Sequence, residues 1–393
     1  MNMKTKLVIF GITGDLSTRK LLPALEQIIG TGDFDDLSIV GVSRHDVNLG
    51  ELLDGLTLLQ DRTSMFAMDL ADESAYGRLK DYLALAPDEQ ALIYLSVPPS
   101  AAAQIVDLLS QANLNTPNIK LLFEKPFGFD LSSAQDLIRR IAQSYDETQV
   151  YRIDHYMAKE VAAEVIRFRT NAELERHPWN NESIESVDIV ASETLGVGHR
   201  AGFYEQTGAL RDVLQGHLLQ LLSLVLMDVS DNYVTEDLPM YRLSALENLD
   251  PVDPASAKRA QYDGYQEEVG NIGSTTETFV SLMLTSHDPV WQGVSFRLTT
   301  GKELSEKKTA ITIGFNDGTS DVFQEDANSI EQVPGAYGRV LMDAINGRKS
   351  IFTTSPEIIR AWEILASLQK NWQMNTDGLV IYEKGSKLED LIA

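Results

Sequence analysis

The chain contains 393 residues, 43% of them hydrophobic, and carries a formal net charge of −25. This length predicts two domains, and this apolar content is typical of packed cores and excludes a disordered chain. The absence of cysteine excludes disulfides, thiolate metal sites and cysteine nucleophiles and indicates a reducing, cytoplasmic compartment.

The negative charge also bears on partners. A surface of this charge repels nucleic acid and anionic lipid, and no stretch approaches the roughly 18 apolar residues of a membrane span. We therefore expect neither nucleic acid nor a membrane as a partner. A phosphate ligand would need basic groups or helix N-termini placed at its own site.

The first predicted element is a strand that runs into a glycine turn. Residues 7–10 (LVIF) form a continuous apolar run, typical of a parallel strand buried on both faces and too short for a signal peptide. Gly11 and Gly14 follow, and a helical apolar pattern extends from about Leu16 to Ile29. Strand, turn and helix form the phosphate-binding geometry of a dinucleotide fold. The spacing departs from G-x-G-x-x-G, so a plain structural turn explains this segment equally well.

The second predicted strand runs from Ser38 to Val42 and ends at Ser43-Arg44. An enzyme that uses NAD usually places an acidic residue there for the ribose hydroxyls, whereas arginine suits a 2′-phosphate. This position favours NADP over NAD. The alternative is that Arg44 is an ordinary surface residue.

Two further strands complete the first half. One is expected over Ala91–Ser100, and the other over Ile119–Gly128, where it ends in Glu124-Lys125-Pro126. Helical patterns lie between and after them, so strands and helices alternate as in a doubly wound parallel sheet. We predict a Rossmann-type domain over residues 1–150, with Lys125 at the ligand-binding edge of its sheet.

The pattern changes after about Tyr151, where strands no longer alternate with helices. This change predicts an α+β domain over residues 151–393 with a mainly antiparallel sheet. Helices are expected over about 157–169, 207–228, 336–346 and 357–369, and strands over 186–193 and within TETFVSLMLT, SFRLTTGKEL and ITIGF.

Two places in the second half carry candidate chemistry. The stretch YRIDHYMAKE (151–160) holds Asp154, His155 and Lys159, and a solvated helix face is the simpler alternative to a site. His217 lies in the long apolar helix near Arg211 and Asp212, and a core histidine is the simpler alternative there. The histidines and carboxylates show no metal-ligand spacing such as H-x-x-x-H, so we expect no metal.

Several motifs in this order resemble those of glucose-6-phosphate dehydrogenases: GITGDLSTRKLLPAL, EKPFG, RIDHY-x-x-KE and GALRDVLQGHLLQ. The resemblance implies oxidation of glucose 6-phosphate at C1 to 6-phosphoglucono-1,5-lactone, the entry step of the pentose phosphate pathway. It implies NADP as the coenzyme, with NAD use left open, and a small sugar phosphate as the partner.

The resemblance also implies residue roles. His217 would be the general base and Asp154 its carboxylate partner, a pairing that stabilises the imidazolium as it forms. The implied coenzyme residues are Gly11, Thr13, Gly14, Asp15, Leu16, Lys20, Arg44 and Lys125. The implied substrate residues are Lys125, His155, Tyr156, Lys159, Glu193, Asp212, Lys302 and Lys307.

The chain departs from the family pattern in one long region. After ITIGFNDGTSDVFQEDANSIEQVPG it passes directly to AYGRV, where the family has further strands that contribute to the sheet and to the subunit interface. A homo-oligomer therefore stays open, because part of that interface is missing. Gly216 also replaces the usual asparagine before the histidine.

Two other interpretations of the function remain. A Gfo/Idh/MocA-type or related dehydrogenase would share the Rossmann domain and the EKP motif and would act on another sugar or sugar phosphate. A non-catalytic NADP or sugar-phosphate sensor would keep the fold, but it would have no need of the pair Asp154 and His217.

Overall fold

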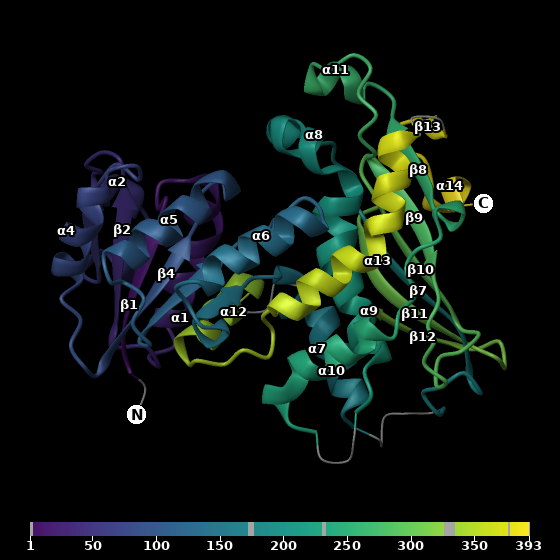
Figure 1. Cartoon of the computed structure of the whole chain (residues 1–393), viewed down its shortest axis with the longest axis horizontal. Helices are drawn as coiled ribbons and strands as arrows, with labels where there is room; N and C mark the ends of the chain where they lie inside the picture. Colours follow the sequence, from purple (N-terminus) through teal and green to yellow (C-terminus); the bar gives the residue numbers. More distant parts are fainter. Residues whose placement is uncertain (1–2, 172–176, 230–232, 326–334, 376–377, 393) are drawn as a thin grey trace. The chain divides into compact units, whose positions relative to one another are not determined.

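The computed structural model describes residues 3–171, 177–229, 233–325, 335–375 and 378–392. The chain forms two compact units made of interleaved segments (Figure 1). Unit 1 comprises 1–127, 135–158 and 330–355, and unit 2 comprises 128–134, 159–329 and 356–393. The functional domains expected over 1–150 and 151–393 remain a prediction. Part of the segment between ITIGF and AYGRV, residues 326–334, lies outside the described residues.

Unit 1 is built on a six-stranded parallel sheet in the order β3-β2-β1-β4-β5-β6. Its strands are β1 (Lys4–Phe10), β2 (Leu37–Ser43), β3 (Thr63–Ala67), β4 (Glu89–Leu95), β5 (Ile119–Phe123) and β6 (Val150–Arg152). This arrangement confirms the predicted Rossmann-type sheet. The order reverses between β1 and β4, and ligands of such sheets bind at that reversal, beyond the carboxyl ends of the strands.

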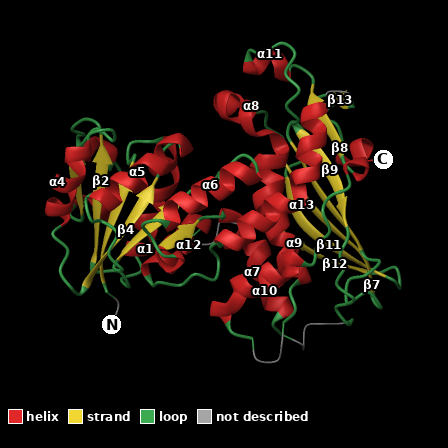
Figure 2. Ribbon diagram, in the orientation of Figure 1, coloured by secondary structure: helices red, strands yellow, loops and turns green. Residues whose placement is uncertain are grey.

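Helices cover both faces of this sheet (Figure 2). Leu7 and Ile9 face a core shared with Leu25 of α1 and Leu341 of α12, whereas Phe10 on the other face stacks on Tyr76 of α4. The helical segments are η1 (Ser17–Leu21), α1 (Leu22–Ile29), α2 (Leu49–Leu52), α3 (Thr57–Gln60), α4 (Glu73–Leu83), α5 (Pro99–Gln111), η2 (Glu147–Gln149), η3 (His155–Ala158) and α12 (Ala336–Ile345). The late helix α12 thus completes the core of unit 1.

Unit 2 contains a seven-stranded mixed sheet in the order β12-β11-β7-β10-β9-β8-β13. The pairs β7–β10 and β8–β13 are parallel and the other pairs are antiparallel, which confirms the predicted mainly antiparallel sheet. The strands are β7 (Ile184–Ser192), β8 (Lys258–Tyr262), β9 (Phe279–Leu284), β10 (Ser295–Gly301), β11 (Lys308–Phe315), β12 (Ser320–Gln324) and β13 (Leu379–Tyr382).

The helices of unit 2 include the segment that carries His217. The remaining helical segments are α7 (Glu160–Arg169), η4 (Gly198–Arg200), α8 (Ala201–Ala209), η5 (Leu210–Leu218), α9 (Leu219–Leu226), η6 (Thr235–Asp237), α10 (Leu238–Glu247), η7 (Pro254–Ser256), α11 (Tyr265–Val269), α13 (Ser355–Met374) and α14 (Leu388–Ile392). Helix α6 (Leu131–Ala142) begins in the unit 2 segment and continues in unit 1.

Several predicted boundaries differ from the observed ones. The strand expected over Ala91–Ser100 ends at Leu95, because Pro99 begins α5. The single helix expected over 207–228 is interrupted at Gly208, whose backbone is not helical, and it continues as the π-helix η5 and then α9.

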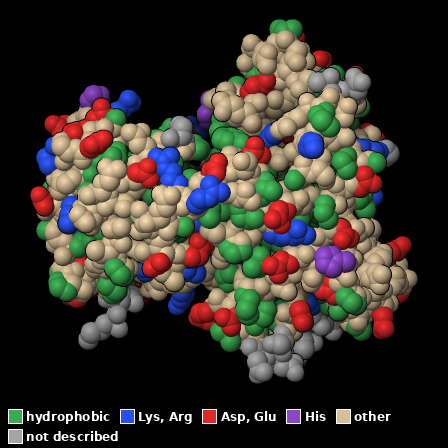
Figure 3. Space-filling model, viewed as in Figure 1, with side chains coloured by type: hydrophobic (Ala, Val, Ile, Leu, Met, Phe, Trp, Pro, Cys, Tyr) green, Lys and Arg blue, Asp and Glu red, His purple; other side chains and the backbone are tan. Residues whose placement is uncertain are grey.

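Charged side chains are dispersed over the face of the molecule that Figure 3 shows. Figure 3 shows acidic side chains scattered over the viewed face, with Lys and Arg between them. Among the described residues, no helix is both long and apolar enough to cross a membrane.

Candidate active site

The turn after β1 is shaped by two glycines. Gly11 has φ of +80°, and a Cβ at this position would lie 2.3 Å from the carbonyl oxygen of Ser96, so no other residue fits. The amide of Gly14 donates to the carbonyl of Gly11 over 2.9 Å, and the Ser17 hydroxyl donates to that carbonyl over 3.0 Å. The turn is therefore a braced structure at the reversal point of the sheet.

The other predicted coenzyme residues in this part of unit 1 are accessible. Thr13, Asp15, Lys20 and Arg44 are exposed and Leu16 is half-buried. Arg44 directly follows β2, the strand next to β1, so the residue lies at the carboxyl edge of the sheet. Asp15 forms an ion pair of 2.9 Å with Arg19.

Two acidic residues, the half-buried Glu124 and the buried Asp154, lie at the ends of β5 and β6. The Tyr94 hydroxyl donates to the carboxyl group of Glu124, which precedes Lys125. Burial raises the pKa of Glu124 to about 7, and the negative charge of Asp154 adds to this rise, while the Tyr94 hydrogen bond and Lys125 oppose it. The acid pair Glu124 and Asp154 therefore favours a proton on Glu124 near neutral pH.

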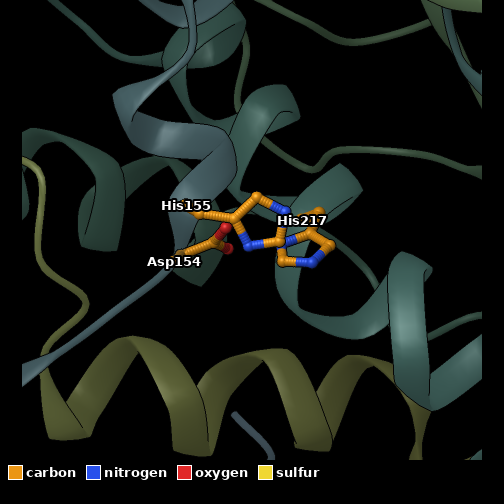
Figure 4. Close-up of side chains that lie close together, drawn as sticks. All are labelled: Asp154, His155 and His217. Carbon is orange, nitrogen blue, oxygen red and sulfur yellow. The ribbon is translucent and has the colours of Figure 1, made fainter. Parts of the chain in front are cut away.

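Asp154 and His155 lie where β6 passes into η3 (Figure 4). Asp154 is 2% exposed and its Oδ1 accepts a hydrogen bond of 2.9 Å from the Tyr156 amide. The His155 ring stacks on Tyr337 of α12 at 6.1 Å and meets the Tyr156 ring edge-on. The short 3-10 turn thus fixes one carboxylate and presents two aromatic polar groups.

In unit 2, three predicted substrate residues surround Tyr204. Glu193 follows β7 and Lys302 follows the neighbouring strand β10, and the Lys302 ammonium donates to the Glu193 carboxylate. The ammonium also lies 5.3 Å from the centroid of the Tyr204 ring. Burial raises the pKa of Tyr204 well above its usual value, and the negative charge of Asp212 contributes.

Helix η5 brings Asp212 and His217 to this part of unit 2. Asp212 forms an ion pair of 3.0 Å with Arg200, and His217 is 5% exposed. The helix packs against β7, β9 and β10, which fixes its axis on the sheet. A largely buried imidazole held on a braced helix is suited to proton transfer, because its usual pKa lies close to neutral.

The remaining two lysines differ in setting. Lys159, at the start of α7, forms an ion pair of 3.0 Å with Glu325 just beyond β12. Lys307 is exposed on the loop between β10 and β11.

Sequence reasoning missed several partners of these residues. The motif EKP places Glu124 beside Lys125, but the bond to Tyr94 spans 30 residues and leaves no local signal. Arg200 is 12 residues from Asp212, and Tyr337 comes from a segment that no motif linked to His155. Each is brought in by tertiary packing.

The glycine turn at the reversal point of a parallel sheet and an acid–base set of histidine and carboxylates are typical of nicotinamide-dependent oxidoreductases. Comparison with known proteins supports this class. The family model described as "Glucose-6-phosphate dehydrogenase, NAD binding domain" matches residues 8–163, and "Glucose-6-phosphate dehydrogenase, C-terminal domain" matches 164–333 and 325–390. The chain belongs to the glucose-6-phosphate dehydrogenase family, as its motifs predicted, and it is an oxidoreductase with a domain for a nicotinamide coenzyme.

Individual relatives agree over nearly the whole chain. Glucose-6-phosphate 1-dehydrogenase of Gluconobacter oxydans is 30% identical, with 96% of this chain and 93% of the relative covered. A structure described as "Glucose-6-phosphate dehydrogenase in complex with its substrate glucose-6-phosphate" has a TM-score of 0.87 at 26% identity and covers 98% of this chain and 96% of its own. A dehydrogenase, MviM, from Clostridium difficile shares the fold alone, with a TM-score of 0.54 at 12% identity over 95% of this chain and 100% of its own.

The alignment with the Gluconobacter relative also concerns the region where this chain is shorter than the family pattern. It extends over 456 positions with the Gluconobacter relative, more than the 393 residues of this chain. The relative therefore has residues without a counterpart here, as expected for a short member of the family.

Proposed function

We propose that the protein oxidises glucose 6-phosphate at C1 to 6-phosphoglucono-1,5-lactone with NADP, in the cytoplasm, as the entry step of the pentose phosphate pathway. The observation that carries this proposal is the likeness, over 98% of the chain, to a relative whose structure is described as a complex with its substrate glucose 6-phosphate. The substrate residues expected from the motifs, apart from Tyr156, are basic or acidic, which suits a phosphorylated sugar.

The coenzyme would be held in unit 1. The braced turn at Gly11 and Gly14 lets the backbone approach a pyrophosphate, with Thr13, Asp15 and Leu16 beside it and Lys20 on the following helix. Arg44, exposed beyond β2, has the charge that a 2′-phosphate needs, which is the reason for NADP. When bound, the nicotinamide supplies the acceptor for the hydride from C1.

Proton removal is assigned to His217. Its neutral imidazole takes the proton of the C1 hydroxyl as the hydride leaves, and it needs a partner that stabilises the resulting cation. Asp154 is that proposed partner, because its buried carboxylate is oriented by the Tyr156 amide and shares its surroundings with the proton-holding Glu124.

Substrate binding divides between phosphate and sugar. His155, Tyr156 and Lys159 are proposed to bind the phosphate, and Lys125 to lie between sugar and nicotinamide. Glu193, Asp212 and the two lysines Lys302 and Lys307 are proposed for the sugar. The observed pair Lys302–Glu193 and the pair Arg200–Asp212 support this, because each carboxylate is held by a cation that orients its oxygen atoms.

One alternative remains, that the site acts on another sugar phosphate. Gly216 next to His217, in place of the usual asparagine, is the observation that favours it, because the change removes a side chain from the helix that carries the proposed base.

Steady-state reduction of NADP and NAD, measured with glucose 6-phosphate, glucose and a panel of other sugar phosphates, tests the proposal. We expect the highest kcat/KM for glucose 6-phosphate with NADP. Preference for another sugar phosphate would support the alternative. Binding of both ligands without reduction of either coenzyme would refute the proposed activity.

A further inference from the structure

We propose that Glu277 is a positioning residue, which clamps the N-terminus of η5 against Gly208 and so fixes the helix that presents Asp212 and His217. The inference rests on the proposed function for the roles of Asp212 and His217. Its geometry lies entirely within unit 2 and concerns a residue outside every motif.

Gly208 provides the space for this clamp. Its φ of 62° and ψ of 179° lie in a region that only glycine adopts readily, and they break the helix between α8 and η5. A Cβ on Gly208 would lie 2.3 Å from Oε1 of Glu277 and 2.9 Å from Oε2. The carboxylate therefore packs directly on the bare Cα of the glycine, and any side chain there would displace it.

Glu277 meets two amides where η5 begins. The amide of Leu210 donates to Oε1 of Glu277 over 3.0 Å, and the amide of Ala209 donates to its main-chain carbonyl over 2.9 Å. The first amides of a helix have no partner within the helix, and an acidic side chain there also complements the helix dipole. One residue thus satisfies two donors and neutralises the helix end.

The clamp is anchored to the sheet. Glu277 lies two residues before β9, and the amide of the next residue, Thr278, donates to the Ala260 carbonyl of β8 over 2.9 Å. The Glu277 side chain is 5% exposed. Burial raises its pKa, while the Leu210 amide and the charges of Arg211 and Arg259 oppose this rise. The side chain is therefore a buried, hydrogen-bonded connection from sheet to helix.

This connection matters because the break at Gly208 separates the π-helix η5 from the helical residues before it. At its other end η5 continues into α9. Asp212 comes two residues after the clamped amide of Leu210, and His217 comes seven residues after it. Loss of the clamp would let the start of the helix rotate or fray. A displacement of about 1 Å at a catalytic group costs on the order of a hundredfold in rate.

Three variants and a control test the inference. Glu277→Ala removes the clamp, and Glu277→Gln keeps an oxygen acceptor for the Leu210 amide. Gly208→Ala leaves Glu277 in the chain but displaces its carboxylate. Glu267→Ala is the control, because Glu267 is an exposed glutamate on the nearby helix α11. Thermal unfolding followed by far-ultraviolet circular dichroism, together with NADP affinity measured by equilibrium binding, serves as the test of folding.

We expect Glu277→Ala and Gly208→Ala to lower kcat by about tenfold to a hundredfold, with NADP affinity within about twofold of the wild type. Glu277→Gln should recover most of kcat, and Glu267→Ala should match the wild type. Wild-type kcat in both alanine variants, or a glutamine variant as impaired as Glu277→Ala, would overturn the role of the clamp. If Glu277→Ala does not fold, the comparison of Gly208→Ala with Glu277→Gln decides.

Hydrogen exchange separates this inference from the proposed reaction. The amides at the start of η5 should exchange at least about tenfold faster in Glu277→Ala than in the wild type, whether or not any substrate is turned over. Unchanged exchange would overturn the clamp. Absence of turnover by the wild type would instead count against the proposed function.

Discussion

The half-buried acid Glu124 makes a prediction about stability and pH that can be worked from the structure. Its carboxyl group accepts a hydrogen bond from Tyr94 on β4, and its charged neighbours are Lys125 on the same segment and Asp154 after β6. We consider Glu124→Gln, which has nearly the shape of the protonated acid and keeps an oxygen acceptor for the Tyr94 hydroxyl.

The pKa of Glu124 rises from 4.5 to about 7 on folding, mainly through burial, which corresponds to on the order of 3 kcal/mol. Below about pH 4.5 the group is protonated in both the folded and the unfolded chain, and the folded state is not penalised. Between about pH 4.5 and 7 only the unfolded chain loses the proton, so the free energy of unfolding falls as pH rises. Above about pH 7 the loss is complete. The glutamine variant cannot ionise, so its free energy of unfolding does not fall in this way.

Urea unfolding followed by far-ultraviolet circular dichroism measures this difference. At about pH 8.5 the variant should be more stable than the wild type by on the order of 2 to 3 kcal/mol, and at about pH 5 by much less. Glu73→Gln, at an exposed glutamate of unit 1, is the control and should show no such dependence on pH. An equal effect of Glu124→Gln at both pH values would refute the argument that burial holds a proton on Glu124.

Three further predictions concern the proposed reaction. His217→Asn should lower kcat by about 10²- to 10⁴-fold with little change in sugar-phosphate binding, and a wild-type kcat would remove His217 as the base. Lys159→Ala should raise the KM for glucose 6-phosphate by about tenfold or more through loss of a charged hydrogen bond, and Lys80→Ala, at an exposed lysine of α4, is the control. An unchanged KM would remove Lys159 as a phosphate ligand and leave it in a structural role that includes its ion pair with Glu325. Arg44→Ala should lower the ratio of kcat/KM for NADP to that for NAD by about tenfold or more, and an unaltered ratio would argue against 2′-phosphate recognition by Arg44.

Local patterns were sufficient to predict the parallel sheet. The apolar run of residues 7–10 and the glycines after it are local sequence signals of a buried strand and a tight turn. The class of the second sheet also followed from its alternating strands. The family was recognisable because its motifs keep their residue types and order.

Long-range packing was not predictable in the same way. Helix α12 has an ordinary helical pattern, but no local signal shows that it packs beside α1 on a sheet formed by the first part of the chain. The three-residue strand β6 is too short for a period, although Asp154 follows it. In the sequence, Glu277 is an ordinary acidic residue before a strand. Its role depends on Gly208, 69 residues earlier, and the backbone conformation of that glycine cannot be predicted from the apolar pattern.

The central claim is that a hydride leaves C1 of glucose 6-phosphate for the nicotinamide. Glucose 6-phosphate deuterated at C1 tests it directly, because the label follows the hydride. We predict that mass spectrometry will find one deuterium in the reduced coenzyme and none in the lactone or its hydrolysis product. Reduced coenzyme without deuterium, or label retained in the product, would contradict the assignment of the reaction to C1.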